Sequence, residues 1–168
     1  MKPTYGTQLR HLVELLDGAV SDAYASAGLD YRPRYTPVMR ALLAAEPATL
    51  GTIADAAGIT QPAATQTVAL MVKDGLVSVE PSPLDARQKM IRLTEHGRAL
   101  VPALQACWQA TAMAAASLEA ELPFPLSEVL DSAIQALAIK PMGDRIKDAR
   151  AQLTQASTPT TQEKGRKK

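Results

Sequence analysis

Cysteine and aromatic residues are both scarce in this sequence, and their scarcity limits the possible cross-links and the composition of the core. The chain of 168 residues contains one cysteine, which rules out an intramolecular disulfide and does not favour a cysteine-based metal site. Aromatic residues make up 4% of the chain although 46% of it is hydrophobic, so we expect a core of Ala, Leu, Val and Met. Because Ala and Leu lead the helix propensity scale, this composition predicts a mainly helical fold.

Long hydrophobic runs are also missing. No segment approaches the roughly 18 consecutive apolar residues of a membrane-spanning helix, so we expect no membrane partner. The first stretch, MKPTYGTQLRHLVELLDG, has no apolar centre, so we expect no signal peptide. Together with the single thiol, these absences favour a reducing, cytoplasmic setting.

Motifs for catalysis and for metal binding are absent as well. The sequence has no Ser/His/Asp arrangement, Walker-type loop or glycine-rich dinucleotide turn. His11 and His96 are too far apart, with too few local partners, to indicate a metal site. Cys107 has no basic neighbour in sequence that would activate it, so we expect a packed core or interface residue. The sequence therefore predicts neither an enzyme nor a bound cofactor or metal.

The net charge of +1 is unusual for a nucleic-acid-binding protein, but the charge is unevenly distributed. Residues 94–139 carry one basic and five acidic residues, whereas residues 140–168 carry eight basic and three acidic residues. The segments before residue 94 are balanced. Any DNA-binding face must therefore be built locally rather than from bulk charge.

Helical patterns dominate what the sequence does contain. Apolar residues at spacings of three and four predict a helix over residues 6–27 that ends near Gly28. Thr36 is expected to cap a short helix with proline in its first turn. A further short helix ends in a sharp turn at Gly58, and Thr60 is expected to cap the helix after it.

A β-hairpin and more helices are expected to follow. The alternating, β-branched segments LVSVE at 76–80 and QKMIRLT at 88–94 predict two strands joined by a turn-rich loop. Thr94 is expected to cap a long helix. Later helical patterns cover residues 127–139 and 144–153.

Two short helices joined by a glycine turn, with a hairpin directly after them, fit a winged helix-turn-helix. The second helix begins with small, neutral residues, and a recognition helix needs little bulk where it enters the major groove. Gln61 and Gln66 can pair with adenine, and Thr65 can meet a phosphate or a base. The alternative is an ordinary surface helix. The predicted DNA-binding residues of this helix are Thr60, Gln61, Pro62, Ala63, Thr65, Gln66 and Ala69.

The expected wing adds Asp85, Arg87 and Lys89 to the predicted DNA-binding residues. Asp85 lies two residues before Arg87 and can hold its guanidinium in one orientation. An oriented arginine at a hairpin tip suits a narrow, A·T-rich minor groove, which is strongly negative. The alternative is a solvated, charged loop.

These pieces together resemble one known family. The segment from TLGTIADAAGITQ to LTEHGRAL, with its KDGLV helix exit and D-A-R wing, resembles the core of a MarR-type transcriptional regulator. The resemblance covers about residues 36–105. It implies an obligate homodimer with interleaved first and last helices, bound to a pseudo-palindromic DNA site. It also implies, most often, a repressor that is released by a small molecule or by oxidation.

The sequence departs from the family in its charges. Family members often carry arginine at the places of Gln66 and Ala86, and both residues are uncharged here. Fewer phosphate contacts predict weaker binding and a shallower salt dependence. The basic residues from Lys164 to Lys168 form either a compensating arm or a solubilising terminus.

The resemblance also implies a ligand site. Family members often bind phenolic or carboxylic compounds between the dimer helices and the winged lobe, and polar aromatic residues gather here at the joint between the first two helices. Each candidate is equally compatible with a structural role. The candidates are His11, Tyr24, Tyr31, Tyr35, Arg40 and Trp108.

The sequence thus predicts a mainly α protein with a small β-hairpin wing, acting as a homodimeric regulator that binds double-stranded DNA. The alternative from another class is a winged helix that serves as a protein-interaction module without operator binding. The expected parts are an N-terminal dimerisation helix and linker (1–35), a winged helix-turn-helix lobe (36–93), a long helix with C-terminal dimerisation helices (94–153) and a disordered basic tail (154–168).

Overall fold

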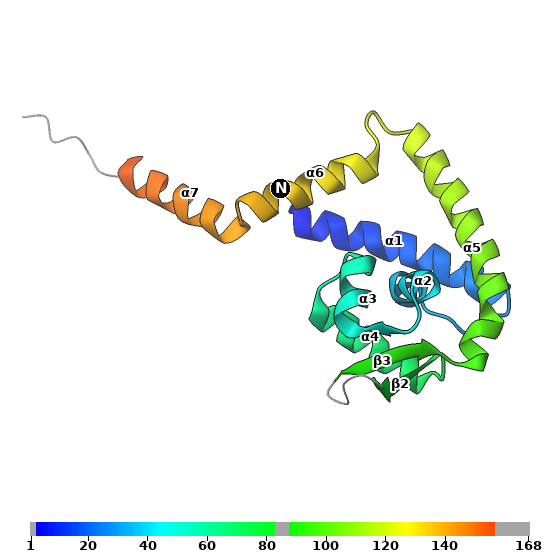
Figure 1. Cartoon of the computed structure of the whole chain (residues 1–168). Helices are drawn as coiled ribbons and strands as arrows, with labels where there is room; N and C mark the ends of the chain where they lie inside the picture. Colours follow the sequence, from blue (N-terminus) through cyan, green and yellow to red (C-terminus); the bar gives the residue numbers. More distant parts are fainter. Residues whose placement is uncertain (1–2, 83–87, 157–168) are drawn as a thin grey trace, which may run out of the picture. The chain divides into compact units, whose positions relative to one another are not determined.

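Helices and one small sheet make up the computed structural model, which describes residues 3–82 and 88–156 (Figure 1). The chain divides into two units, Met1–Ala114 and Ala115–Lys168. In chain order, the elements are α1 (Tyr5–Ser26), the 3-10 turn η1 (Pro33–Tyr35), α2 (Thr36–Ala44), β1 (Ala48–Thr49), α3 (Leu50–Ala57), α4 (Gln61–Lys73), β2 (Val77–Pro81), β3 (Lys89–Leu93), α5 (Glu95–Ala120), α6 (Leu126–Ile139) and α7 (Met142–Ala156).

The first unit has one hydrophobic core, to which α2, α3, α4 and the sheet contribute together with Tyr24 of α1 and Leu104 of α5. The sheet is antiparallel in the order β1-β3-β2, and Val77 pairs with Leu93 at its inner end. The mainly helical winged fold is therefore confirmed. Its largest fully buried side chains are Tyr24, Tyr35, Val38, Met39, Leu42, Ile53, Met71, Leu76, Ile91 and Leu104.

Local interactions explain why α3 and α4 meet in a sharp turn. Thr49 caps α3 by accepting a hydrogen bond from the backbone N–H of Thr52 at 3.2 Å. Gly58 ends α3 at φ 64°, a left-handed conformation that glycine adopts without strain. The hydroxyl of Thr60 then accepts from the N–H of Ala63 at 3.4 Å and starts α4. The capping roles predicted for Gly58 and Thr60 are confirmed.

Two details differ from the sequence prediction. Thr36 does not cap α2, because the 3-10 turn η1 leads directly into that helix and Tyr35 occupies the capping position without a side-chain bond. The hydroxyl of Thr36 is instead 3.0 Å from that of Tyr24. The two-residue strand β1 was not predicted, because so short a strand has no alternation of its own and exists only by pairing with β3.

The second unit contains α6 and α7, each with its own end interactions. Glu119 accepts hydrogen bonds from the hydroxyl and the N–H of Ser127 at 2.6 and 3.2 Å, and these bonds lower the pKa of its carboxyl group. Arg145 donates to the carbonyl oxygens of Ala136 and Lys140, both at 3.0 Å, and so satisfies the end of α6.

Apolar side chains remain exposed on α1 and on the helices of the second unit. Contiguous exposed apolar surface is typical of interaction sites. Within the described residues, no helix is both long and apolar enough to cross a membrane. The exposed large apolar residues of α1 are Tyr5, Leu9, Val13, Leu15 and Leu16, and those of α6 are Val129, Leu130, Ile134, Leu137 and Ile139.

Candidate nucleic-acid interface

The front end of α4 presents the small, neutral surface that its sequence predicts. Ala64, Val68 and Met71 are buried on the opposite face, which fixes the rotation of the helix on the core. Ala63 is half-buried between the two faces. The other predicted contact residues that follow the cap are all exposed together, namely Gln61, Pro62, Thr65, Gln66 and Ala69.

The hydroxyl of Thr65 is already used within the helix. It donates its hydrogen to the carbonyl oxygen of Gln61 at 2.8 Å. Its free lone pairs can accept from a base amino group, whereas a phosphate offers no donor to them. In this rotamer, Thr65 is therefore suited to a base edge and not to the backbone of a nucleic acid.

Strands β2 and β3 support the wing, and part of the predicted wing lies beyond the described residues. Lys89 is exposed at the start of β3, where it pairs with Pro81. The side chains of Arg92 and Glu80 are 3.5 Å apart across the strands, so the charge of Arg92 is partly neutralised. Asp85 and Arg87, like Ala86, fall in the segment 83–87 outside the described residues.

A close junction joins the end of α4, the start of β2 and the first turn of α5. The hydroxyl of Thr94 donates to the carbonyl oxygen of Gly75 at 2.6 Å and accepts from the N–H of Gly97 at 2.9 Å. The predicted capping role of Thr94 is confirmed. Gly97 packs so closely on Leu76 that an added Cβ atom would overlap the carbonyl oxygen of Leu76.

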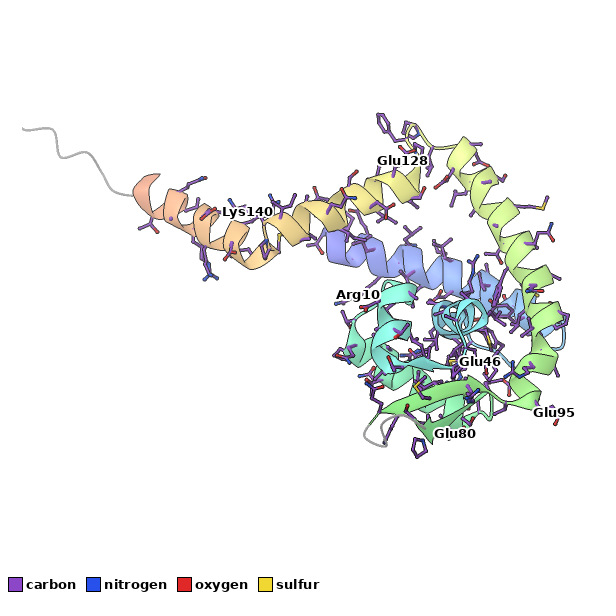
Figure 2. All side chains as sticks on the ribbon, in the orientation of Figure 1. Arg10, Glu46, Glu80, Glu95, Glu128 and Lys140 are labelled. Carbon is purple, nitrogen blue, oxygen red and sulfur yellow. The ribbon has the colours of Figure 1, made fainter. Side chains whose placement is uncertain are left out.

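A half-buried carboxylate fixes the return strand of the wing to the rest of the unit. Glu46, labelled in Figure 2, accepts from the N–H of Leu93 at 2.8 Å. The same carboxylate binds both terminal nitrogens of Arg98, at 2.8 and 2.6 Å. The Glu46 side chain is 14% exposed, and the two-pronged geometry of its contact with Arg98 fixes the relative orientation of the two groups. Glu46 thus links the segment after α2 to β3 and α5.

The opposite end of α4 is held by an aromatic hydroxyl. Tyr35 donates to the Oδ2 atom of Asp74 at 2.7 Å. Burial, followed by the hydrogen bond to Asp74 and the charge of Asp74, raises the pKa of Tyr35 to about 12. Tyr35 therefore remains a protonated donor at neutral pH.

Five of the six predicted ligand residues come together in the first unit. The ring of Tyr31 makes edge contacts with the rings of Tyr24 and Tyr35, with centroids 5.1 and 5.6 Å apart. Trp108 donates to the hydroxyl of Tyr24 at 3.0 Å, and the guanidinium of Arg40 lies 5.6 Å from the indole ring. His11 is not part of this aromatic cluster, because it lies on α1 with its side chain 71% exposed.

One polar atom of the aromatic cluster is unsatisfied. The hydroxyl of Tyr31 is buried and has no hydrogen-bond partner among the described residues. Thr36 is a polar neighbour of this hydroxyl, but the Thr36 hydroxyl is bonded to Tyr24. Burial raises the pKa of Tyr31, so this hydroxyl is an idle neutral donor. Buried polar groups without partners are rare and costly, so this one calls for an explanation.

Sequence reasoning missed Glu46, Asp74 and Arg98 as parts of the interface's support. The residues that Glu46 joins are 47 and 52 positions away in the chain, and Tyr35 is 39 positions from Asp74. No local pattern encodes such pairs. Cys107 is half-buried against the core, as expected, and no cluster of possible metal ligands occurs in the described part of the chain.

Comparisons with known proteins agree with this geometry. Residues 28–88 match the family model described as MarR family, and no curated protein matches the chain. Among solved structures, the M. tuberculosis transcriptional regulator MosR in complex with DNA is similar at 23% identity, over 82% of this chain and 97% of that one, with a TM-score of 0.62.

Two further structures share the fold. The transcriptional repressor CouR, bound to a 23-mer DNA duplex, is 22% identical over 81% of this chain and 91% of its own, with a TM-score of 0.53. The regulator PcaV from Streptomyces coelicolor, in complex with its natural ligand, is 20% identical over 83% of this chain and 98% of its own, with a TM-score of 0.55. At these identities the similarity shows a common fold.

Proposed function

We propose that this chain, whose residues 28–88 match the MarR family model, is a sequence-specific regulator of transcription that binds double-stranded DNA. The observation that carries the proposal is the front of α4, where five exposed, uncharged residues stand on a helix capped by Thr60. Their small size lets the helix reach the floor of the major groove, where Gln61 and Gln66 pair with adenine. Two of the similar proteins, MosR and CouR, were solved with DNA, which supports the same partner here.

The active form that we propose is a homodimer on a pseudo-palindromic site. Helix α1 exposes apolar residues such as Leu9 and Val13, and α6 separately exposes residues such as Ile134 and Leu137. A second copy can cover each of these faces. A two-fold dimer presents two α4 helices, which meet successive major grooves when they lie about 34 Å apart. Binding at a promoter then blocks transcription, so that the regulator acts as a repressor.

Selection of bound sequences from random duplex DNA tests this proposal, together with the solution mass of the protein. We expect a two-fold symmetric motif whose half-sites lie about 10 base pairs apart, and a dimeric protein. If duplexes are ignored even at low salt, the winged helix serves as a protein-interaction module. A monomeric protein that selects a single half-site would refute the dimer alone.

We further propose that a small aromatic carboxylate releases the repressor by binding at the aromatic cluster. Arg40 is exposed beside the half-buried ring of Trp108, where it can receive a carboxylate, and the idle hydroxyl of Tyr31 can donate to a bound ligand. A ligand that prefers one separation of the two recognition helices shifts the DNA-binding equilibrium.

Titration with salicylate and related carboxylates, followed by Trp108 fluorescence, checks this site. We expect saturable quenching and a parallel loss of operator affinity. Arg40→Gln should weaken the response about tenfold, since it removes a charge-assisted contact. Arg34→Gln, at another exposed arginine of the same unit, is the matched control and should respond as the original protein does. An unchanged emission and unchanged DNA affinity would contradict the ligand site.

A further inference from the structure

Asp74 is rigidly tied to the last turn of α4. Its backbone N–H donates to the carbonyl oxygen of Leu70 at 2.9 Å. Two residues later, the N–H of Leu76 donates to the carbonyl oxygen of Met71, also at 2.9 Å. Gly75 between them has φ 71°, a conformation that lets the chain reverse directly after the helix. Whatever holds the carboxylate of Asp74 therefore holds the end of the recognition helix.

Tyr35 is the best-anchored partner of that carboxylate. Its side chain is fully buried, and its hydroxyl donates to Asp74 at 2.7 Å. The ring is in turn held by an edge contact with Tyr31. Because protein interiors are closely packed, a donor on a fully buried ring constrains the position of its acceptor.

Arg32 also contacts Asp74, but it is a weaker anchor. Its Nε atom is 3.6 Å from the Oδ2 atom of Asp74, and its guanidinium lies 5.8 Å from the centroid of the Tyr35 ring. The Arg32 side chain is 56% exposed, and exposed ion pairs contribute little because water and salt screen them. The direction of α4 thus depends on the hydroxyl of Tyr35 more than on the charge of Arg32.

Helix α4 connects the Tyr35–Asp74 hydrogen bond at its end to the predicted DNA contacts at its start. It has 13 residues, so Gln61 lies about 20 Å along the axis from its far end. It packs on the core along its length through Ala64, Thr67, Val68 and Met71 and therefore moves as one rigid body. A shift of the end at Asp74 therefore changes the angle of the whole helix and displaces its front end. Bidentate contacts with base edges tolerate only small displacements.

We propose that Tyr35 is a positioning residue for DNA recognition, which acts by holding Asp74 and so setting the angle at which α4 approaches the major groove. This inference rests on the proposed DNA binding. Tyr35 touches no base in this scheme. Its substitution should therefore reduce sequence-specific affinity while it leaves the charge-driven, non-specific affinity unchanged.

Tyr35→Phe tests the inference, because phenylalanine keeps the ring packing and removes only the hydroxyl. We expect about a tenfold loss of affinity for the selected operator, with unchanged affinity for a random duplex of equal length. Trp108 emission should not change, since the aromatic cluster stays packed. Asp74→Ala should show the same loss of operator affinity. Asp74→Asn should keep most of that affinity, because its amide oxygen can still accept the hydrogen bond from Tyr35. The double variant Tyr35→Phe/Asp74→Ala should lose no more operator affinity than either single variant.

The outcomes separate this inference from the proposed function. If the original protein binds no duplex, the proposed function fails. If it binds its operator and the Tyr35→Phe variant binds it equally well, the positioning role is overturned. Tighter binding by Asp74→Ala would also overturn it, because the carboxylate would then act only by repelling phosphates. Parallel losses of specific and non-specific affinity would indicate general loss of fold and count against the inference.

Discussion

A Gly97→Ala variant is expected to lose about 1–3 kcal/mol of folding free energy, although alanine is the better helix former. The Cβ atom that alanine adds would overlap the carbonyl oxygen of Leu76, which is backbone and cannot rotate away. The first turn of α5 would have to move off the junction and stretch the hydrogen bonds that Thr94 makes with Gly75 and Gly97. Urea unfolding at fixed protein concentration measures the loss.

The matched control is Gly51→Ala, at another helical glycine of the same unit. A Cβ atom there would meet only the hydroxyl of Thr49, at 3.9 Å, which is an ordinary contact. We expect this variant to be neutral or more stable by about 0.5–1 kcal/mol, because alanine loses less backbone entropy on folding. Equal stabilities of the two variants would show that the backbone around Gly97 can move to accommodate the added Cβ atom without loss of folding free energy.

A Gln66→Glu variant is expected to bind the selected operator at least about tenfold more weakly. The amide of glutamine donates to one adenine atom and accepts from another, whereas a carboxylate only accepts. The new charge also lies on the exposed front of α4, which in our proposal enters the negatively charged major groove. Because the lost base contact and the added repulsion both act only in the complex with DNA, the folding stability of the free protein should hardly change. Fluorescence anisotropy with labelled operator measures the effect.

Gln105→Glu makes the same charge change on α5, at an exposed residue far along the chain from α4. It should leave operator affinity within about twofold, since exposed charges more than a Debye length away are screened. For Gln66→Glu, raising the salt concentration separates the loss of the base contact from the repulsion by phosphates. Salt weakens the repulsion, whereas the affinity lost with the base contact is not recovered. If both variants bind as the original protein does, α4 does not read bases.

Local signals explain which parts of the fold the sequence could predict. Thr60 and Gly58 act on neighbours within a few residues, so capping and turn preferences alone place α3 and α4. Thr36 has an equally good capping signal, but a tertiary hydrogen bond to Tyr24 takes its hydroxyl. Strand β1 is visible only through its partner strand. The prediction failed where a distant contact outweighed a local preference.

The candidate interface divides in the same way. Exposure of Gln61 and Gln66 follows from the helical period, which places the buried stripe on the other side. The supports behind the interface do not follow from any period, because Glu46 and Arg98 are chosen for a three-dimensional fit across 52 positions. Tyr35 was expected to be near a ligand from its chemistry, and only the structure shows that its hydroxyl is engaged by Asp74.

The uncharged front of α4 has a kinetic consequence for how such a regulator finds its target. Residence on a random duplex depends on ionic contacts with phosphates, and the front of α4 from Gln61 to Ala69 carries no cation, so in our proposal it adds none of these contacts. We therefore expect each encounter of this face with a random duplex to be brief. Fewer copies of the protein would then be held away from the correct site than if this face carried cations.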